Sequence, residues 1–218
     1  MPATRYQKIN AHHYRHIWVV GDIHGEYQLL QSRLHQLSFF PEIDLLISVG
    51  DNIDRGPESL DVLRLLNQPW FTSVKGNHEA MALEAFETGD GNMWLASGGD
   101  WFFDLNDSEQ QEAIDLLLKF HHLPHIIEIT NDNIKYAIAH ADYPGSEYLF
   151  GKEIAESELL WPVDRVQKSL NGELQQINGA DYFIFGHMMF DNIQTFANQI
   201  YIDTGSPNSG RLSFYKIK

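Results

Sequence analysis

The first half of the sequence repeats one pattern, in HIWVVGDIHG (residues 16–25), LLISVGDNIDRG (residues 45–56) and WFTSVKGNHE (residues 70–79). Each stretch is a short apolar run that reaches a glycine and is followed by acidic, amide or imidazole side chains. Short apolar runs bounded by turn residues are typical of buried strands. Leucines at helical spacing follow the first two runs, so strands and helices alternate along the chain. This alternation favours a mixed α/β fold.

The segments between these strands carry helix signals. The leucine spacing predicts a helix over residues 26–37, Pro57 suits the first turn of a second helix, and a third helix is expected over residues 77–87. We expect a loop over the glycine-rich residues 89–99. The capping-box pattern at residues 108–111 predicts the start of a further helix.

The second half of the chain is dominated by strand patterns. An Asn-Asp-Asn turn separates two apolar runs and predicts a hairpin, and two later runs are close enough to pair. The expected strands are residues 126–129, 134–139, 182–185, 193–196, 200–203 and 212–217. Strand–helix repeats followed by hairpins predict two sheets with helices on the outside.

Length and composition limit the class of protein. The chain has 218 residues, of which 43% are hydrophobic and 21% charged, as in ordinary globular proteins. We find no linker or internal repeat, and expect a single domain over residues 1–218. No apolar run approaches the ~20 residues that a membrane span requires. The beginning of the chain lacks the apolar region of a secretory signal, so we expect a cytoplasmic protein.

The charge and the absence of cysteine restrict its partners and ligands further. The net charge of −15 disfavours binding to nucleic acid or to an anionic membrane. With no cysteine, disulfides and thiolate metal sites are excluded, and histidines and acids are the available metal ligands. Nothing in the sequence indicates the oligomeric state.

Candidate metal ligands follow five of the expected strands. Ligand sites in α/β proteins form at the carboxyl ends of strands. Asp22 and His24 are separated by one residue, so on an extended chain both side chains point the same way. The six candidates are Asp22, His24, Asp51, Asn77, His140 and His187.

These six ligands suit two ions better than one. A single structural zinc normally takes four ligands, whereas two ions roughly 3.5–4 Å apart share a bridging carboxylate. Asp51 stands at the centre of the set and is the natural bridge. Oxygen and imidazole ligands without thiolate suit Mn²⁺, Fe or Zn²⁺. Each residue alone has an ordinary explanation, such as a turn Asp or a helix cap at Asn77. Separate explanations of this kind are less convincing for five polar clusters that each directly follow an apolar strand.

The order and separation of GDIHG, GDNIDRG and GNHE resemble the PPP-type metallophosphatases, in particular the branch of the bacteriophage lambda serine/threonine phosphatase and its bacterial relatives. The similarity runs from about Tyr6 to near the C-terminus, and GGDWFF, AHADYP, FIFGH and FANQIYIDTG extend it. The resemblance implies a calcineurin-like fold, in which two mixed β-sheets pack as a sandwich flanked by helices. It places a dimetal site at the C-terminal ends of the strands.

The resemblance also assigns roles. It implies that the first ion is held by Asp22 and His24, that Asp51 bridges, and that the second ion is held by Asn77, His140 and His187. It makes His78 the general acid, oriented by Asp54, and makes Arg55 a phosphate ligand. It implies Mn²⁺ as the ion for assay.

Two positions depart from the family pattern. Lys75 stands where relatives carry an arginine before GNHE, and lysine keeps the charge but loses the bidentate fork. A second phosphate-binding arginine is expected at the position of Val163. Either Arg165 replaces it, or one phosphate contact is missing, or the loop is shifted with nothing lost. We therefore treat Lys75 and Arg165 as candidate substrate-binding residues.

The sequence is compatible with three functions. The first is a metal-dependent phosphomonoesterase acting on phosphoproteins, a serine/threonine protein phosphatase. The second is a dinucleoside polyphosphate hydrolase of the diadenosine tetraphosphate type, which typically lacks the Asp of DRG and has Asp after GNH. Asp54 and Glu79 favour the first. The third is a non-catalytic metal-binding module, which only Val163 supports.

Overall fold

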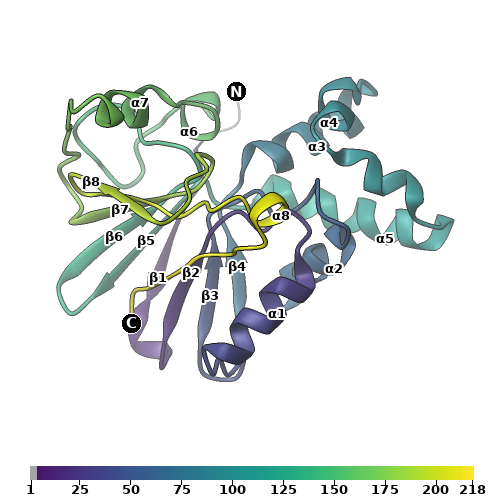
Figure 1. The fold of residues 1–218 in the computed structure, drawn as a ribbon, viewed down its shortest axis with the longest axis horizontal. Coiled ribbons are helices and arrows are strands. Elements are labelled where there is room, and N and C mark those ends of the chain that lie inside the picture. Colours follow the sequence, from purple (N-terminus) through teal and green to yellow (C-terminus); the bar gives the residue numbers. More distant parts are fainter. Residues whose placement is uncertain (1–3) are drawn as a thin grey trace.

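The computed structural model describes residues 4–218 and places the strands at the centre with helices outside (Figure 1). The strands are β1 (Tyr6–Asn10), β2 (Ile17–Val20), β3 (Leu45–Ser48), β4 (Phe71–Ser73), β5 (Ile126–Asn131), β6 (Ile134–Ile138), β7 (Tyr182–Phe185), β8 (Gln194–Phe196), β9 (Gln199–Tyr201) and β10 (Phe214–Lys216). The helices are α1 (Tyr27–Gln36), α2 (Ser59–Arg64), α3 (Asn77–Thr88), α4 (Asn92–Ala96), α5 (Asp107–Leu117), α6 (Ser157–Leu160), α7 (Asp164–Leu170) and α8 (Ser206–Ser209). Within this part of the chain, none of the helices has the length and apolar character needed to cross a bilayer.

The strands form two mixed sheets, as predicted. One sheet has the order β1-β5-β6-β7-β9-β8, and the other has the order β10-β2-β3-β4. In the smaller sheet β2, β3 and β4 are parallel, and β10 runs antiparallel to β2. In the larger sheet the predicted hairpin joins β5 and β6, and the predicted pair β8 and β9 is antiparallel.

The alternation of side chains along the strands builds a core on each side of the smaller sheet. Ile17 and Ile47 point between the two sheets, where they pack with Ile138 of the larger sheet. Val20 and Leu46 point to the opposite face, which α1 and α2 cover. The sheets are therefore packed as the predicted sandwich, with an apolar layer between them.

A helical region lies beyond β4 at one end of the molecule (Figure 1). It comprises α3, α4, α5 and the 3₁₀ helix η3 (Gly99–Asp104). Its apolar core includes Trp94, Trp101 and Phe102, packed against Leu63 of α2. The region therefore has a core of its own, built on the helices that follow β3 and β4.

Some local predictions are wrong, for identifiable reasons. The expected loop over residues 89–99 contains α4, whose five residues are too few to show helical periodicity. The capping box is present, but its first residue is Asn106 and not Ser108. The side chain of Asn106 accepts hydrogen bonds from the backbone N–H groups of Ser108 and Glu109. β1 is also missing from the sequence-based prediction, because it is largely polar and lies at a sheet edge.

Replacing Ile47 with alanine tests the packing between the sheets. Ile47 is fully buried, and a buried Ile→Ala change typically lowers the free energy of unfolding by ~2–5 kcal/mol. Ile43 is 47% exposed, so Ile43→Ala should change it by no more than about 0.5 kcal/mol. Denaturant unfolding of both variants makes the comparison, and equal losses would contradict this assignment of the core.

Candidate active site

The predicted ligands lie where strands end and the chain turns. Asp22 and His24 follow β2, Asp51 follows β3, and Asn77 begins α3 just after β4. In the larger sheet, His140 follows β6 and His187 follows β7. Five of the six side chains are buried, and His187 is partly buried. The topology therefore brings residues from both sheets to one place.

Asp51 stands between two groups of potential ligand atoms. His24, Asp51 and His78 form one group, and Asp51, His140 and His187 form the other. The Oδ2 atom of Asp51 is 3.8 Å from His24 Nε2, and its Oδ1 atom is 3.4 Å from His140 Nε2. The carboxylate thus presents one oxygen to each group, which is the arrangement that a bridging ligand requires.

Asp22 and Asn77 lie beside these groups. The carboxylate of Asp22 accepts the backbone N–H of His187, at 3.0 Å and 3.2 Å to its two oxygens. Asn77 Oδ1 is 2.7 Å from His140 Nε2 and 3.0 Å from His187 Nδ1. Asn77 therefore lies with the second group, whereas Asp22 belongs to neither group and is held against the loop that carries His187.

The hydrogen-bond partners of the imidazole rings indicate that the two groups of ligand atoms fit a cation. His140 Nδ1 is 2.8 Å from the carbonyl of Val49, so the proton of a neutral ring lies on Nδ1. Its Nε2 lone pair then faces Asn77 Oδ1, which is another acceptor. His24 Nδ1 similarly lies 2.9 Å from the carbonyl of Ile53 and leaves its Nε2 unprotonated. The lone pairs of His140 Nε2 and Asn77 Oδ1, which meet without a proton between them, are suited to a divalent ion.

The electrostatics agree with this fit. Burial lowers the pKa of His24 to about 3 and that of His187 to about 4, so both rings stay neutral and able to ligate. Burial, together with repulsion from Asp203 and Asp51, raises the pKa of Asp22 well above its usual value. Bound cations would relieve this repulsion between carboxylates.

His78, which belongs to the first group, also contacts Asp54 and Arg55. His78 Nδ1 is 2.7 Å from Asp54 Oδ2, and both side chains are buried. Although burial lowers the pKa of His78, the carboxylates of Asp51 and Asp54 outweigh it and raise the pKa above its usual value. Arg55 Nη2 lies 2.9 Å from His78 Nε2, and Arg55 Nη1 lies 3.0 Å from His24 Nε2. The predicted general acid, its partner and the predicted phosphate ligand are thus in contact.

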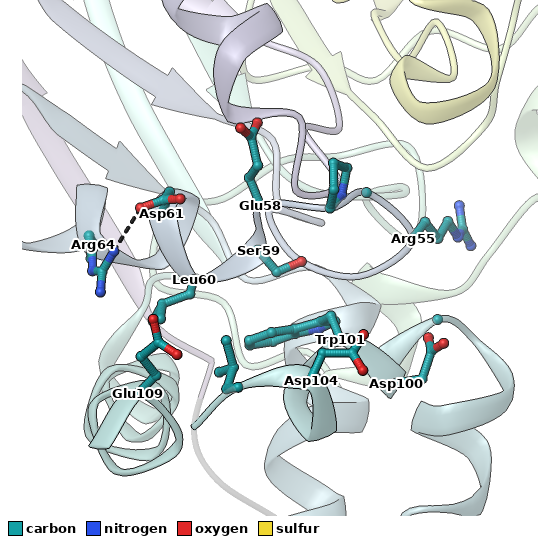
Figure 2. A pocket seen from close by; sticks show the side chains of 14 residues that line it. Arg55, Glu58, Ser59, Leu60, Asp61, Arg64, Asp100, Trp101, Asp104 and Glu109 are labelled. Atoms are coloured by element: carbon teal, nitrogen blue, oxygen red, sulfur yellow. Dashed lines mark hydrogen bonds and ion pairs between the residues drawn. The ribbon is translucent and has the colours of Figure 1, made fainter. Parts of the chain in front are cut away.

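Arg55 also borders a cavity of about 570 Å³ (Figure 2). Figure 2 shows Trp101 beside Asp104 along one wall, with Arg55 and Asp100 at the same end. The acidic residues that line the cavity are Glu58, Asp61, Asp100, Asp104 and Glu109. Arg55 therefore stands between the metal-ligand groups and an open, largely acidic space.

The two candidate substrate-binding residues, Lys75 and Arg165, are paired with acidic side chains outside the metal-ligand groups. Lys75 Nζ forms an ion pair with Glu156 Oε1 at 3.1 Å. Arg165 donates from Nε to Asp142 at 2.8 Å and from Nη2 to two backbone carbonyls. In the described part of the chain, no hydrogen bond or ion pair joins either side chain to the metal-ligand groups. A phosphate role for Lys75 or Arg165 stays a prediction that these contacts do not favour.

The structure also shows site residues that the sequence-based prediction missed. From the sequence, Glu79 serves only to distinguish a protein phosphatase from a dinucleoside polyphosphate hydrolase. Its carboxylate accepts the backbone N–H groups of Asp51, Asn52 and Gly76 at 2.7–2.8 Å, and so joins the loops after β3 and β4. Its position in GNHE could have suggested this role, since a Glu at the third position of a helix often bonds the preceding turn.

Comparison with known proteins agrees with this geometry. The sequence profile of the calcineurin-like phosphoesterase family matches residues 15–190. The chain is 99% identical, over the full length of both, to "Serine/threonine-protein phosphatase 2" of Escherichia coli (strain K12). It is 33% identical to a symmetrical bis(5'-nucleosyl)-tetraphosphatase of Erwinia tasmaniensis, over 57% of this chain and 43% of that protein. A solved protein serine/threonine phosphatase from Saccharomyces cerevisiae, with similarity to human phosphatase PP5, has the same fold with a TM-score of 0.63. The two are 19% identical, and the match covers 92% of this chain and 70% of that one.

Substitution of Asp51 and His187 tests whether one carboxylate serves two ions. Because Asp51 belongs to both groups, Asp51→Asn should weaken binding of both ions, whereas His187→Ala should weaken only one. Metal content after gel filtration, with His121→Ala as a control, measures the difference. The same metal content in the Asp51 and His187 variants would contradict a bridging role.

Acid release of metal tests the protonation of the ligands. A proton displaces metal only below the pKa of the ring, and the pKa values of His24 and His187 are about 3 and about 4. Since a bound cation lowers these pKa values further, retained metal should stay constant from neutral pH to about pH 5 and be lost only near or below pH 4. Metal content measured across a pH series checks this expectation. Half-loss near pH 6.5, the ordinary value for histidine, would contradict neutral buried rings.

Proposed function

The chain belongs to the calcineurin-like phosphoesterase family, and we propose from that premise that it is a metal-dependent serine/threonine protein phosphatase. One observation carries the proposal: the His78–Asp54 pair and Arg55 stand together beside two groups of metal ligands that share Asp51. The names of close relatives point the same way, including a 60% identical "Serine/threonine-protein phosphatase 2" of Salmonella typhimurium. We propose that the whole chain acts as one domain.

The residues at the strand ends fit two divalent ions, and we propose manganese. His24 and Asp22 would hold one ion, and Asp51 would contact both. The other ion would be held by Asn77, His140 and His187. When bound, such ions supply an acidified water as nucleophile and neutralise the charge of the phosphoryl oxygens. The chain contributes an array of neutral imidazoles and carboxylates fixed on strand ends before the ions arrive.

Arg55 is suited to bind the phosphate. Its guanidinium carries several donors in a planar fork, which matches the oxygens of a phosphate ester. The side chain is exposed and comes from the loop after β3, so substrate can reach it. Its Nη atoms reach His24 and His78, and both contacts must be released when these rings take up their proposed roles.

His78 is suited to protonate the leaving oxygen. Asp54 accepts the hydrogen bond from Nδ1, so a protonated ring presents its other proton on Nε2. The raised pKa of His78 keeps the ring protonated nearer neutral pH. When the P–O bond of the ester breaks, the Nε2 proton goes to the serine or threonine oxygen. Asp54 stabilises the charged form of the ring and fixes its orientation.

Hydrolysis of dinucleoside polyphosphates is the second candidate, because relatives named bis(5'-nucleosyl)-tetraphosphatase cover part of the chain. Asp54 and Glu79 argue against it, because hydrolases of that type typically lack the Asp of DRG and carry Asp after GNH. A side-by-side assay on a phosphoserine peptide and diadenosine tetraphosphate decides between them. Faster turnover of the dinucleotide would overturn the proposal. A purely metal-binding role is opposed by the intact His78–Asp54 pair.

His78→Asn tests the proposed acid. The variant keeps a polar N–H near the position of Nδ1 but cannot donate the Nε2 proton, so turnover of a phosphoserine peptide with Mn²⁺ should fall by ~10²–10⁴-fold. Asp22→Asn should also lower turnover by orders of magnitude, because it removes a negative ligand. Circular dichroism shows whether the fold survives, and His121→Asn serves as control. Unchanged turnover in both site variants would contradict the assignment.

The preference for phosphoserine or phosphothreonine, the identity of the metal and the cytoplasmic location stay predictions.

A further inference from the structure

Two buried tryptophans hold the partner of the proposed acid. Trp101 Nε1 donates to Asp54 Oδ1 at 2.8 Å. Trp94 Nε1 donates to the same oxygen at 2.9 Å and lies 3.1 Å from Oδ2. Because Oδ2 also accepts the hydrogen bond from His78, each oxygen of this buried carboxylate has at least two donors. Asp54 therefore has no freedom to rotate without losing a hydrogen bond.

The tryptophans are themselves fixed by packing. Trp94 is in α4 and is 3% exposed, and Trp101 is in η3 and is 9% exposed. Their rings meet edge to face at 6.2 Å between centroids, and both contact Phe102. A Cβ at Gly99 would lie 2.5 Å from the ring of Trp94, so this position needs glycine for the ring to reach Asp54. The donors thus come from a rigid support.

The same segment holds the backbone that carries Asp54 and Arg55. Both residues have positive φ values, 74° and 69°, which are unfavourable for residues other than glycine. The backbone N–H of Arg55 donates to the carbonyl of Gly98 at 3.1 Å, and the N–H of Asp54 donates to Ser59 Oγ at 2.9 Å. Contacts from the turn between α4 and η3 and from the start of α2 therefore offset the strain of this turn.

We propose that Trp94 and Trp101 are positioning residues for phosphate ester hydrolysis: their indole N–H groups fix the Asp54 carboxylate, which in turn fixes the ring and the tautomer of His78. The proposal rests on the proposed function, in which His78 protonates the leaving oxygen. Without the indole donors, Oδ1 is a buried anionic oxygen with no partner among the hydrogen bonds described. The carboxylate then has to turn or take up water, and His78 loses its orienting contact.

The dependence of rate on the leaving group separates positioning from general damage. A serine alkoxide is a poor leaving group and needs a proton as the P–O bond breaks, whereas p-nitrophenolate leaves with little help. A residue that acts through the general acid therefore affects phosphoserine far more than p-nitrophenyl phosphate. A residue that merely stabilises the fold, the metals or Arg55 affects both substrates to the same degree.

The test compares Trp94→Phe, Trp101→Phe and the double variant with Trp70→Phe. Trp70 packs on Phe39 and Phe71 and makes no contact with Asp54. With Mn²⁺, kcat on a phosphoserine peptide should fall ~10–100-fold in the double variant, with KM little changed. On p-nitrophenyl phosphate kcat should fall less than ~3-fold, and Trp70→Phe should preserve both rates. Equal losses on both substrates, or no loss, would overturn the proposal.

Phenylalanine is smaller than tryptophan, so a second pair of variants replaces each tryptophan with 3-benzothienylalanine, in which sulfur takes the place of the indole N–H. These variants keep the shape of the ring and remove only the donor. The same selective loss on phosphoserine is expected. Wild-type rates on both substrates would disprove a role for the hydrogen bonds.

A readout that does not depend on activity distinguishes failure of this inference from failure of the proposed function. In ¹⁵N-histidine-labelled protein loaded with diamagnetic Zn²⁺, the Nδ1 proton of His78 should give a slowly exchanging NMR signal. The benzothienyl variants should lose it. If the wild-type protein hydrolyses neither substrate, the proposed function fails, and this signal still decides the positioning role. An unchanged signal in both variants would refute that role.

Discussion

Burying the carboxylate of Asp51 between two groups of imidazoles is unfavourable in the absence of positive charge, and the surrounding loops are arranged around that constraint. The N–H of His78 donates to Asp51 Oδ1 at 3.0 Å, and the N–H of Asp51 itself donates to Glu79 at 2.8 Å. A Cβ at Gly76 would lie 2.2 Å from Asp51 Oδ1, so the turn before α3 can approach the carboxylate only as glycine. These contacts hold Asp51 in place, and two cations would provide the remaining stabilisation.

The backbone at the strand ends shows the same constraint. His24, Asp51, Asp54, Arg55 and His187 all have positive φ values between 46° and 74°. This conformation is uncommon for residues with a side chain, and here it occurs repeatedly at proposed functional positions. It turns the chain sharply in the loops that follow β2, β3 and β7. Such strain persists only where neighbouring contacts determine the loop, and the bonds from Glu79 and Gly98 are contacts of that kind.

The sequence predicted the parts of this arrangement that are local, and missed those that depend on distant partners. The strands before Gly21, Gly50 and Gly76, and the polar clusters after them, were evident because strand length and turn residues act over a few positions. The hydrogen bonds from Trp94 and Trp101 span 40 and 47 residues, and no periodicity signals them. The same holds for the ion pair of Lys75 with Glu156, 81 residues away, which gives the buried lysine an acidic partner that no spacing rule indicates.

The two layers of the site come from different parts of the fold. The strand ends of the sandwich supply the proposed metal ligands other than Asn77, which begins α3, since parallel strands from both sheets end at one place. The helical region supplies the acid machinery: His78 lies in α3, and the donors that hold Asp54 lie in α4 and η3. Glu79 joins the two, because α3 carries it while its partners belong to the loops after β3 and β4. The helical region is therefore part of the site: α4 and η3 act on the proposed acid through Asp54, and α3 also holds Asp51 through Glu79 and His78.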